Sequence, residues 1–124
     1  MKQTLTLPYK LPSLNEIIGA DRRNRYLGGE LKKQWTNTVS LECKKQKLKA
    51  FKNQINITIT WHCKNKKRDK DNIMAGQKFI FDGLIKAGII QNDGWKEIGE
   101  IQHKFTTDTT DKVTITMEEV RQWI

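Results

Sequence analysis

Residues 55–61, INITITW, form the most regular alternation in the chain and constrain its fold more than any other segment. Isoleucine and tryptophan fall on one side of this segment when it is extended, and asparagine and threonine fall on the other. A strand of this kind needs a sheet with one buried face. Weaker alternation over residues 3–7, 98–106 and 113–117 predicts three further strands.

Two longer segments between these strands carry helical spacing. Apolar side chains recur every four residues in the first helix, predicted over residues 31–48: Leu31, Trp35, Val39 and Cys43. A second helix is predicted over residues 71–86, with Gly88 placed just after its last turn.

We expect a loop at residues 19–29, GADRRNRYLGG, because it contains three glycines. The C-terminal residues 118–124 are expected to add a helical turn. The predicted order is β-α-β-α-β-β, which is an α+β fold. We expect a single domain over residues 1–124, a mixed sheet of about four strands and two main helices.

Positive charge is concentrated in the first part of the chain. Residues 1–70 carry 17 Lys and Arg against 5 Asp and Glu, a net charge of +12, whereas residues 71–124 carry 6 against 9, a net charge of −3. This favours a polyanionic partner, and nucleic acid above all. Two readings of the basic residues stay open: Arg22, Arg23 and Arg25 either contact phosphate or are simply solvated, and the same holds for the lysines that flank the first helix.

The cysteines indicate a reducing compartment. Cys43 and Cys63 lack the spacing of a zinc site, also when His62 and His103 are considered, so we expect reduced, buried thiols. No apolar run approaches the ~20 residues of a membrane span, and the N-terminus lacks the apolar stretch of a signal peptide. We therefore expect an intracellular protein.

The densest chemistry follows the strand at 55–61. Asp69 and Asp71 would point to the same side of an extended segment, roughly 7 Å apart at ~3.3 Å per residue. Carboxylate oxygens suit a hard cation such as Mg²⁺, which can activate water and neutralise charge during phosphodiester hydrolysis. The cations around them can attract the DNA backbone: Lys64, Lys66, Lys67, Arg68 and Lys70.

Three further residues are candidates for the same chemistry. Lys78 is placed to contact the scissile phosphate, and Asp82 and Asp93 are further oxygen donors. In one unbroken helix Asp82 would lie about 16 Å from Asp71 along the axis, too far to share a metal. Either a break in the helix at residues 75–77 brings Asp82 nearer, or Asp82 supports a neighbouring group instead of the metal. For Asp93, either the segment after Gly88 runs back along the helix, or a partner subunit supplies this residue.

Each feature also has a reading without catalysis. Asp71 is a plausible helix cap, Asp93 followed by Gly94 is a plausible turn, and a mixed-charge segment such as KNKKRDKDN is commonly a solvated loop.

Taken together, the segments resemble the RusA family of Holliday junction resolvases. The matching residues in the central stretch are Arg68-Asp69-Lys70-Asp71-Asn72, Lys78 to Leu84, Lys86 to Ile90, and Asn92-Asp93. Near the N-terminus, Leu11-Pro12-Ser13-Leu14-Asn15 resembles the family's Pro-Ser-x-Asn element.

The resemblance implies a Mg²⁺-dependent endodeoxyribonuclease, with Mn²⁺ as an alternative metal. It implies a homodimer that places two symmetric nicks across a four-way DNA junction, in the cytoplasm of a bacterium or encoded by its prophage. Asp69, Asp71 and Asp93 match the metal-binding acids, Lys78 matches the active-site lysine, and Asp82 matches a further acidic position.

The sequence departs from the family pattern in two places. Asn92 stands where many members have a second aspartate, and the gap between Asp71 and Lys78 is longer than in the best-known members. Two other functions remain open. One is a non-catalytic DNA- or RNA-binding module on the same fold, and the other is a small regulatory protein.

Overall fold

A mixed four-stranded sheet forms the base of the molecule, in the order β1-β4-β2-β3. The computed structural model describes residues 1–120. The strands are β1 (Lys2–Leu7), β2 (Ile55–Cys63), β3 (Ile98–Thr107) and β4 (Lys112–Glu119). β2 pairs in parallel with β3 and antiparallel with β4, which in turn pairs antiparallel with β1. The predicted α+β class and the four strands are confirmed.

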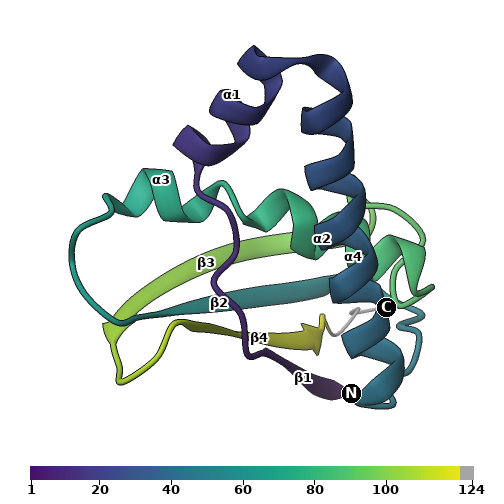
Figure 1. Ribbon diagram of the computed structural model, residues 1–124. Helices are drawn as coiled ribbons and strands as arrows, with labels where there is room; N and C mark the ends of the chain where they lie inside the picture. Colours follow the sequence, from purple (N-terminus) through teal and green to yellow (C-terminus); the bar gives the residue numbers. More distant parts are fainter. Residues whose placement is uncertain (121–124) are drawn as a thin grey trace.

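The helices lie on one face of this sheet (Figure 1). The alternating residues of β2 face them, and Ile55, Ile57, Ile59 and Trp61 are each at most 3% exposed. β1 and β4 contribute further buried side chains to the same core: Leu5, Leu7, Val113, Ile115 and Met117. The alternation in the sequence therefore identified the buried face correctly.

The expected loop at residues 19–29 is helical, so this prediction was wrong. Helix α1 spans Leu14–Arg23 and α2 spans Arg25–Lys45. Ser13 begins α1 with a capping box to Glu16, and the Asn24 side chain accepts a hydrogen bond from Leu27 N at 2.8 Å to begin α2.

One of the glycines that suggested a loop serves helix packing instead. A Cβ atom at Gly28 would collide with the Asp21 side chain, so the absence of a side chain lets α1 and α2 approach closely. The two helices form a hairpin that rises above the sheet (Figure 1). The predicted helix at residues 31–48 is confirmed within α2, where Val39 and Cys43 are fully buried.

The second predicted helix is divided into α3 (Lys70–Met74) and α4 (Gln77–Lys86). The break lies at Ala75 and Gly76, where a Cβ atom on Gly76 would stand 3.1 Å from both Leu11 and the Trp61 ring. α4 ends at Lys86, and Gly88, which follows the capping residue Ala87, adopts a φ of 76°, as expected for the residue after a last turn. The expected C-terminal helical turn is wrong for Glu118 and Glu119, which belong to β4, and residues 121–124 lie outside the described part of the chain.

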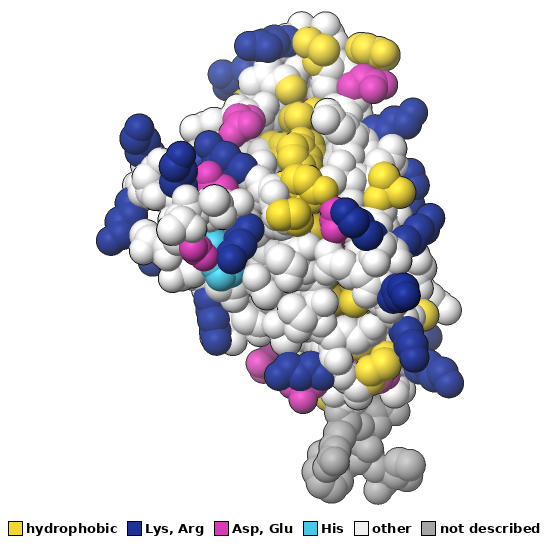
Figure 2. Space-filling view, turned by 60° about the horizontal axis from the view of Figure 1, so that its bottom comes forward, with side chains coloured by type: hydrophobic (Ala, Val, Ile, Leu, Met, Phe, Trp, Pro, Cys, Tyr) yellow, Lys and Arg dark blue, Asp and Glu magenta, His cyan; other side chains and the backbone are white. Residues whose placement is uncertain are grey.

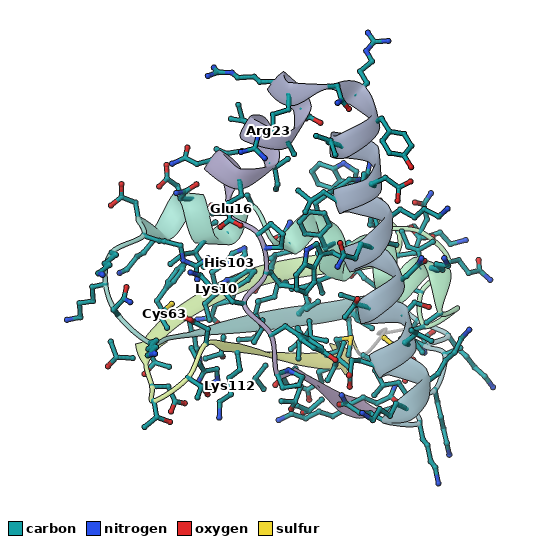
Figure 3. All side chains as sticks on the ribbon, in the orientation of Figure 1. Lys10, Glu16, Arg23, Cys63, His103 and Lys112 are labelled. Carbon is teal, nitrogen blue, oxygen red and sulfur yellow. The ribbon has the colours of Figure 1, made fainter. Side chains whose placement is uncertain are left out.

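His103 joins the sheet to the start of α4. Trp61 Nε1 donates a hydrogen bond to His103 Nδ1 at 2.9 Å, so His103 Nε2 carries the proton that it shares with Gln77 Oε1 at 2.8 Å. Burial lowers the pKa of His103, which favours the neutral ring that this arrangement requires. Figure 3 shows His103 between β3 and the helices.

The other expectations about burial also hold. Cys43 and Cys63 are free, buried thiols, and burial raises the pKa of Cys43 to about 11. A buried carboxylate was not anticipated. Glu42 accepts a hydrogen bond from Tyr9 Oη at 2.7 Å, and this bond holds the pKa of Glu42 below its usual value. Within residues 1–120, no helix combines the length and the apolar character that crossing a membrane requires.

The contact between α2 and α4 yields a test of the fold. A Cβ atom at Gly83 would overlap the buried Val39 side chain. Gly83→Ala is therefore expected to destabilise the protein by about 1–3 kcal/mol, because the packed helices must move apart. The free energy of unfolding in urea measures this change.

Gly19→Ala is the matched control, since a Cβ atom there meets nothing within 4 Å in the structure. It should leave stability unchanged or raise it by up to about 1 kcal/mol. Equal effects of the two substitutions would contradict the described packing.

Candidate active site

An open pocket of about 630 Å³ lies where β2 and β3 end beside the start of α3. Because β2 and β3 are parallel, their last residues, Cys63 and Thr107, are paired neighbours at this end. Apolar side chains in the lining come from three elements: Cys63, Ile73 and Phe105. Polar groups complete it: Asn65, Thr106, Thr107 and the charged residues Lys66, Arg68, Asp69 and Lys70. Figure 3 shows Cys63 at this end of the sheet.

Asp69 is the acidic residue of this pocket. It occupies the residue before α3 with an extended backbone, and its carbonyl oxygen accepts from Ile73 N at 3.1 Å. Its exposed side chain makes no capping hydrogen bond to the helix. The carboxylate therefore stays available to a ligand in the pocket.

Asp71 lies two residues further, in the first turn of α3. The extended spacing that was expected for the two aspartates is thus replaced by the start of a helix. Asp71 Oδ1 accepts a hydrogen bond from Asn72 N at 2.9 Å, and Asn72 Oδ1 accepts from Asn15 N at 3.0 Å. This second bond connects α3 to the beginning of α1. Asp71 does not line the pocket.

The cations around Asp69 have different surroundings. The Arg68 guanidinium donates to Leu11 O at 3.4 Å and lies 3.9 Å from Asp111, so it holds the connecting segment against the body of the protein. Lys70 Nζ lies 5.4 Å from the centre of the Phe105 ring, a cation–π distance. Lys66 lines the pocket, and Lys64 and Lys67 are exposed beside it.

Asp93 lies at the other end of the sheet. Its loop is fixed to the segment before β2, since Phe51 N donates to Ile89 O at 2.9 Å and the Gln54 side chain donates to Trp95 O at 2.9 Å. Asp69 lies beyond the last residue of β2, in the pocket that Cys63 also lines. The nine residues of that strand cover about 26 Å at ~3.3 Å per residue. The structure therefore does not bring Asp93 and Asp69 together within one protomer.

Lys78 and Asp82 form a pair on α4. Lys78 Nζ lies 3.3 Å from Asp82 Oδ1, one helical turn away. Asp82 lines a shallow groove between α2 and α4 together with Lys32, Lys33 and Lys86. Neither Lys78 nor Asp82 lines the Asp69 pocket.

Arg22, Arg23 and Arg25 surround the connection between α1 and α2, and all three are exposed. Figure 3 places Arg23 well above Cys63 and the pocket end of the sheet. Figure 2 shows Lys and Arg side chains around most of the outline of the molecule in that view, with fewer acidic side chains among them.

Within one protomer, few side chains are available to bind a metal ion at the pocket. Across residues 1–120, no group of three His, Cys, Asp or Glu side chains is arranged to hold a metal. The oxygen donors at the pocket nevertheless suit a hard cation, since Mg²⁺ commonly takes only one or two carboxylates and completes its shell with water and phosphate.

Sequence reasoning missed several residues of the site. Phe105, Thr106 and Thr107 join it because the parallel register places the end of β3 beside the end of β2. Trp95, two residues after Asp93, is 96% exposed and does not line this pocket.

A small basic α+β domain with an aspartate carboxylate free in a lysine-lined pocket has the features expected of a protein that acts on nucleic acid. Comparison with known families makes this specific. The family model described as endodeoxyribonuclease RusA matches residues 8–118, and the chain belongs to this family. It is therefore an endodeoxyribonuclease, and its family indicates the resolution of Holliday junctions. Nucleases of this kind generally depend on a divalent metal. No curated protein matches the chain by sequence.

Proposed function

We propose that the protein is a Mg²⁺-dependent, structure-specific endodeoxyribonuclease that acts as a homodimer on four-way DNA junctions and places paired symmetric nicks. One observation supports this most. The Asp69 carboxylate makes no capping hydrogen bond to α3 and lies in an open pocket that Lys66 and Lys70 also line. An anionic backbone and a divalent cation can both enter such a pocket. The match to the RusA family supplies the reaction class.

In this proposal Asp69 and Asp71 hold the metal, with Mg²⁺ preferred and Mn²⁺ as an alternative. When bound, the ion would supply an activated water and neutralise charge on the phosphate. The binding and positioning roles belong to side chains of the protein.

The lysines at the pocket attract and orient the DNA backbone. Lys70 is steadied over the Phe105 ring, 5.4 Å from its centre, so its ammonium group is held near the pocket opening. Arg68 acts mainly as a positioning residue, since its guanidinium contacts Leu11 O and Asp111. Lys64, Lys67, Arg22, Arg23 and Arg25 extend the proposed DNA-binding surface.

Lys78 and Asp82 are assigned less direct roles. The ion pair with Asp82 orients Lys78 on α4, from where it contacts the DNA strand beside the scissile phosphate in this proposal. Asp82 is thus a supporting acid.

We further propose that Asp93 completes the metal site of a partner subunit. Asp93 and Asp69 lie at opposite ends of β2 in one protomer, as the anchored Ile89–Trp95 loop indicates. In a two-fold dimer each subunit can receive the Asp93 carboxylate of the other, so both metal sites are completed. The two reduced, buried cysteines support a cytoplasmic location for the enzyme.

Replacing Asp69 tests the catalytic role. Asp69→Asn should lower cleavage of a synthetic four-way junction in Mg²⁺ by at least about 100-fold, because a metal ligand contributes several kcal/mol. Junction affinity should be kept or should rise, since one negative charge leaves the DNA-facing pocket. Product analysis on denaturing gels and gel-shift titration measure the two effects. Glu118→Gln is the control, since this exposed acid lies in β4 opposite Asn56, near the start of β2.

Two outcomes would contradict this proposal. The first is full cleavage by Asp69→Asn. The second is a parent protein that binds junctions but shows no metal-dependent cleavage, which would instead favour the non-catalytic binding module.

Mixing two inactive variants tests the shared site. A dimer with shared sites has two of them. In a heterodimer of Asp69→Asn and Asp93→Asn subunits, one of these sites retains both aspartates and the other has lost both. We expect the mixture to recover single nicks at up to about a quarter of the parent's rate of nicking, since random exchange makes half of the dimers mixed and each mixed dimer has one intact site of two. A supercoiled plasmid that extrudes a cruciform distinguishes single from paired nicks. Complete inactivity of the exchanged mixture would place all ligands within one subunit.

A further inference from the structure

Trp95 is the most exposed large apolar side chain in the described part of the chain, with 96% of its surface accessible to solvent. It stands alone in its loop, because residues 91–94 and 96–97 are all polar or glycine. Tryptophan commonly buries about 150–250 Å² in a core or an interface. An indole left in water by the fold therefore favours a ligand that covers the ring.

The loop that carries Trp95 has a fixed backbone. The Gln54 side chain donates a hydrogen bond to Trp95 O at 2.9 Å. Gly94 O accepts from Glu97 N at 3.2 Å and from Ile98 N at 3.0 Å, which closes the turn just before β3. A ligand of the indole therefore has to order only two side-chain torsions, so little conformational entropy is lost on binding.

The polar surroundings of the indole favour a nucleobase over a protein surface. Specific protein interfaces bury about 1,200–2,000 Å² around an apolar centre, which one indole among polar neighbours does not provide. A single aromatic face is instead a common platform for stacking an unpaired base. Lys96 and Lys52, which lies on the segment 51–54 that is bonded to this loop, are exposed and balance the acids Asp93 and Glu97 in charge.

The position of Trp95 in the chain connects it to the proposed reaction. Trp95 is two residues from Asp93, which the proposed function assigns to the metal site. Two residues span at most about 7 Å. A phosphate bound at Asp93 therefore brings the bases on either side of it within reach of the indole.

We propose that Trp95 stacks on an exposed base of branched DNA, beside the phosphate bound at Asp93. This inference rests on the proposed function and names a residue that recognises its substrate. In a linear duplex every base is paired and stacked, and drawing one out costs free energy, least where the base is already unpaired. At a branch point the stack is interrupted. Trp95 therefore adds to the affinity for branched DNA and little to the affinity for duplex DNA.

Removing the indole tests the stacking. Trp95→Ala should weaken binding of a synthetic four-way junction by about 5- to 150-fold, since one stacked base contributes about 1–3 kcal/mol. Its affinity for a linear duplex of the same sequence should stay close to the parent's. Gel-shift titrations at one salt concentration measure both affinities, without divalent metal so that the DNA stays intact.

The matched control is Leu41→Ala. It removes an apolar side chain that is 64% exposed on α2, away from the Trp95 loop in sequence. It should leave both affinities unchanged.

Two further variants distinguish a base from a protein as the partner. Trp95→Phe keeps an aromatic face and should retain most of the junction affinity. Trp95→Leu keeps apolar area without such a face and should bind like Trp95→Ala. Because the position is exposed, none of these variants should change the urea midpoint of unfolding.

Fluorescence reports on the indole itself. The emission of Trp95 is the difference between the parent and Trp95→Phe, because the remaining tryptophans are common to both proteins. A base stacked on the ring should quench this emission when the four-way junction binds, and bound linear duplex should not.

The outcomes separate this inference from the proposed nuclease activity. A nuclease in which Trp95→Ala binds and cleaves junctions like the parent would keep the proposed function and overturn the stacking. So would Trp95→Leu that binds as tightly as Trp95→Phe, or Trp95→Ala that weakens subunit association without DNA, since both indicate a protein contact. An inactive parent whose Trp95 emission is quenched by junctions alone would keep the stacking and overturn the proposed function.

Discussion

The parallel pairing of β2 with β3 is the constraint on which the rest of the structure depends. Parallel neighbours need a crossover connection, and here α3 and α4 supply it. Because both strands run the same way, their last residues meet and form two walls of one pocket, with Asp69 at its opening. The same pairing sends the loop that holds Asp93 to the far end of the sheet. A single register thus forms the pocket and separates Asp93 from it within one protomer.

Charge explains why a small domain can combine carboxylates with a DNA-facing surface. Asp69 and Asp71 alone would repel a phosphate backbone, but the chain carries a net charge of +9 and places Lys66 and Lys70 in the same pocket lining as Asp69. Not every cation there faces solvent. Arg68 is bound to Leu11 O and Asp111, which fixes the segment between β2 and α3 and so the position of Asp69. Within one short segment, Arg68 therefore holds the backbone in place while Lys66 and Lys70 line the pocket beside Asp69.

Much of the fold was predictable because its signals are local. Alternation identified the strands, and the period of four identified the core of α2. The expected loop at residues 19–29 is helical because capping outweighs composition there: Ser13 with Glu16, and Asn24, begin two helices that tolerate the glycines. The division of the second helix was left open by the sequence, since it depends on how closely Gly76 approaches Leu11 and Trp61.

The candidate site was predictable only in part, for a physical reason. The residues from 64 to 71 are neighbours in sequence, and the structure keeps them near the end of β2. Phe105 and Thr107 enter the pocket through strand register, which no local pattern records. The separation of Asp93 from Asp69 likewise follows from topology, because it depends on which strands are parallel.

The central claim is that a divalent ion is held at Asp69 by carboxylates from two subunits. A crystal of the protein soaked in Mn²⁺ and measured at the manganese absorption edge tests it most directly. The account predicts an anomalous peak about 2.0–2.3 Å from carboxylate oxygens of Asp69 and of Asp93 of the partner subunit. A peak that lies elsewhere, or beside Asp69 with no second subunit near it, would contradict the account.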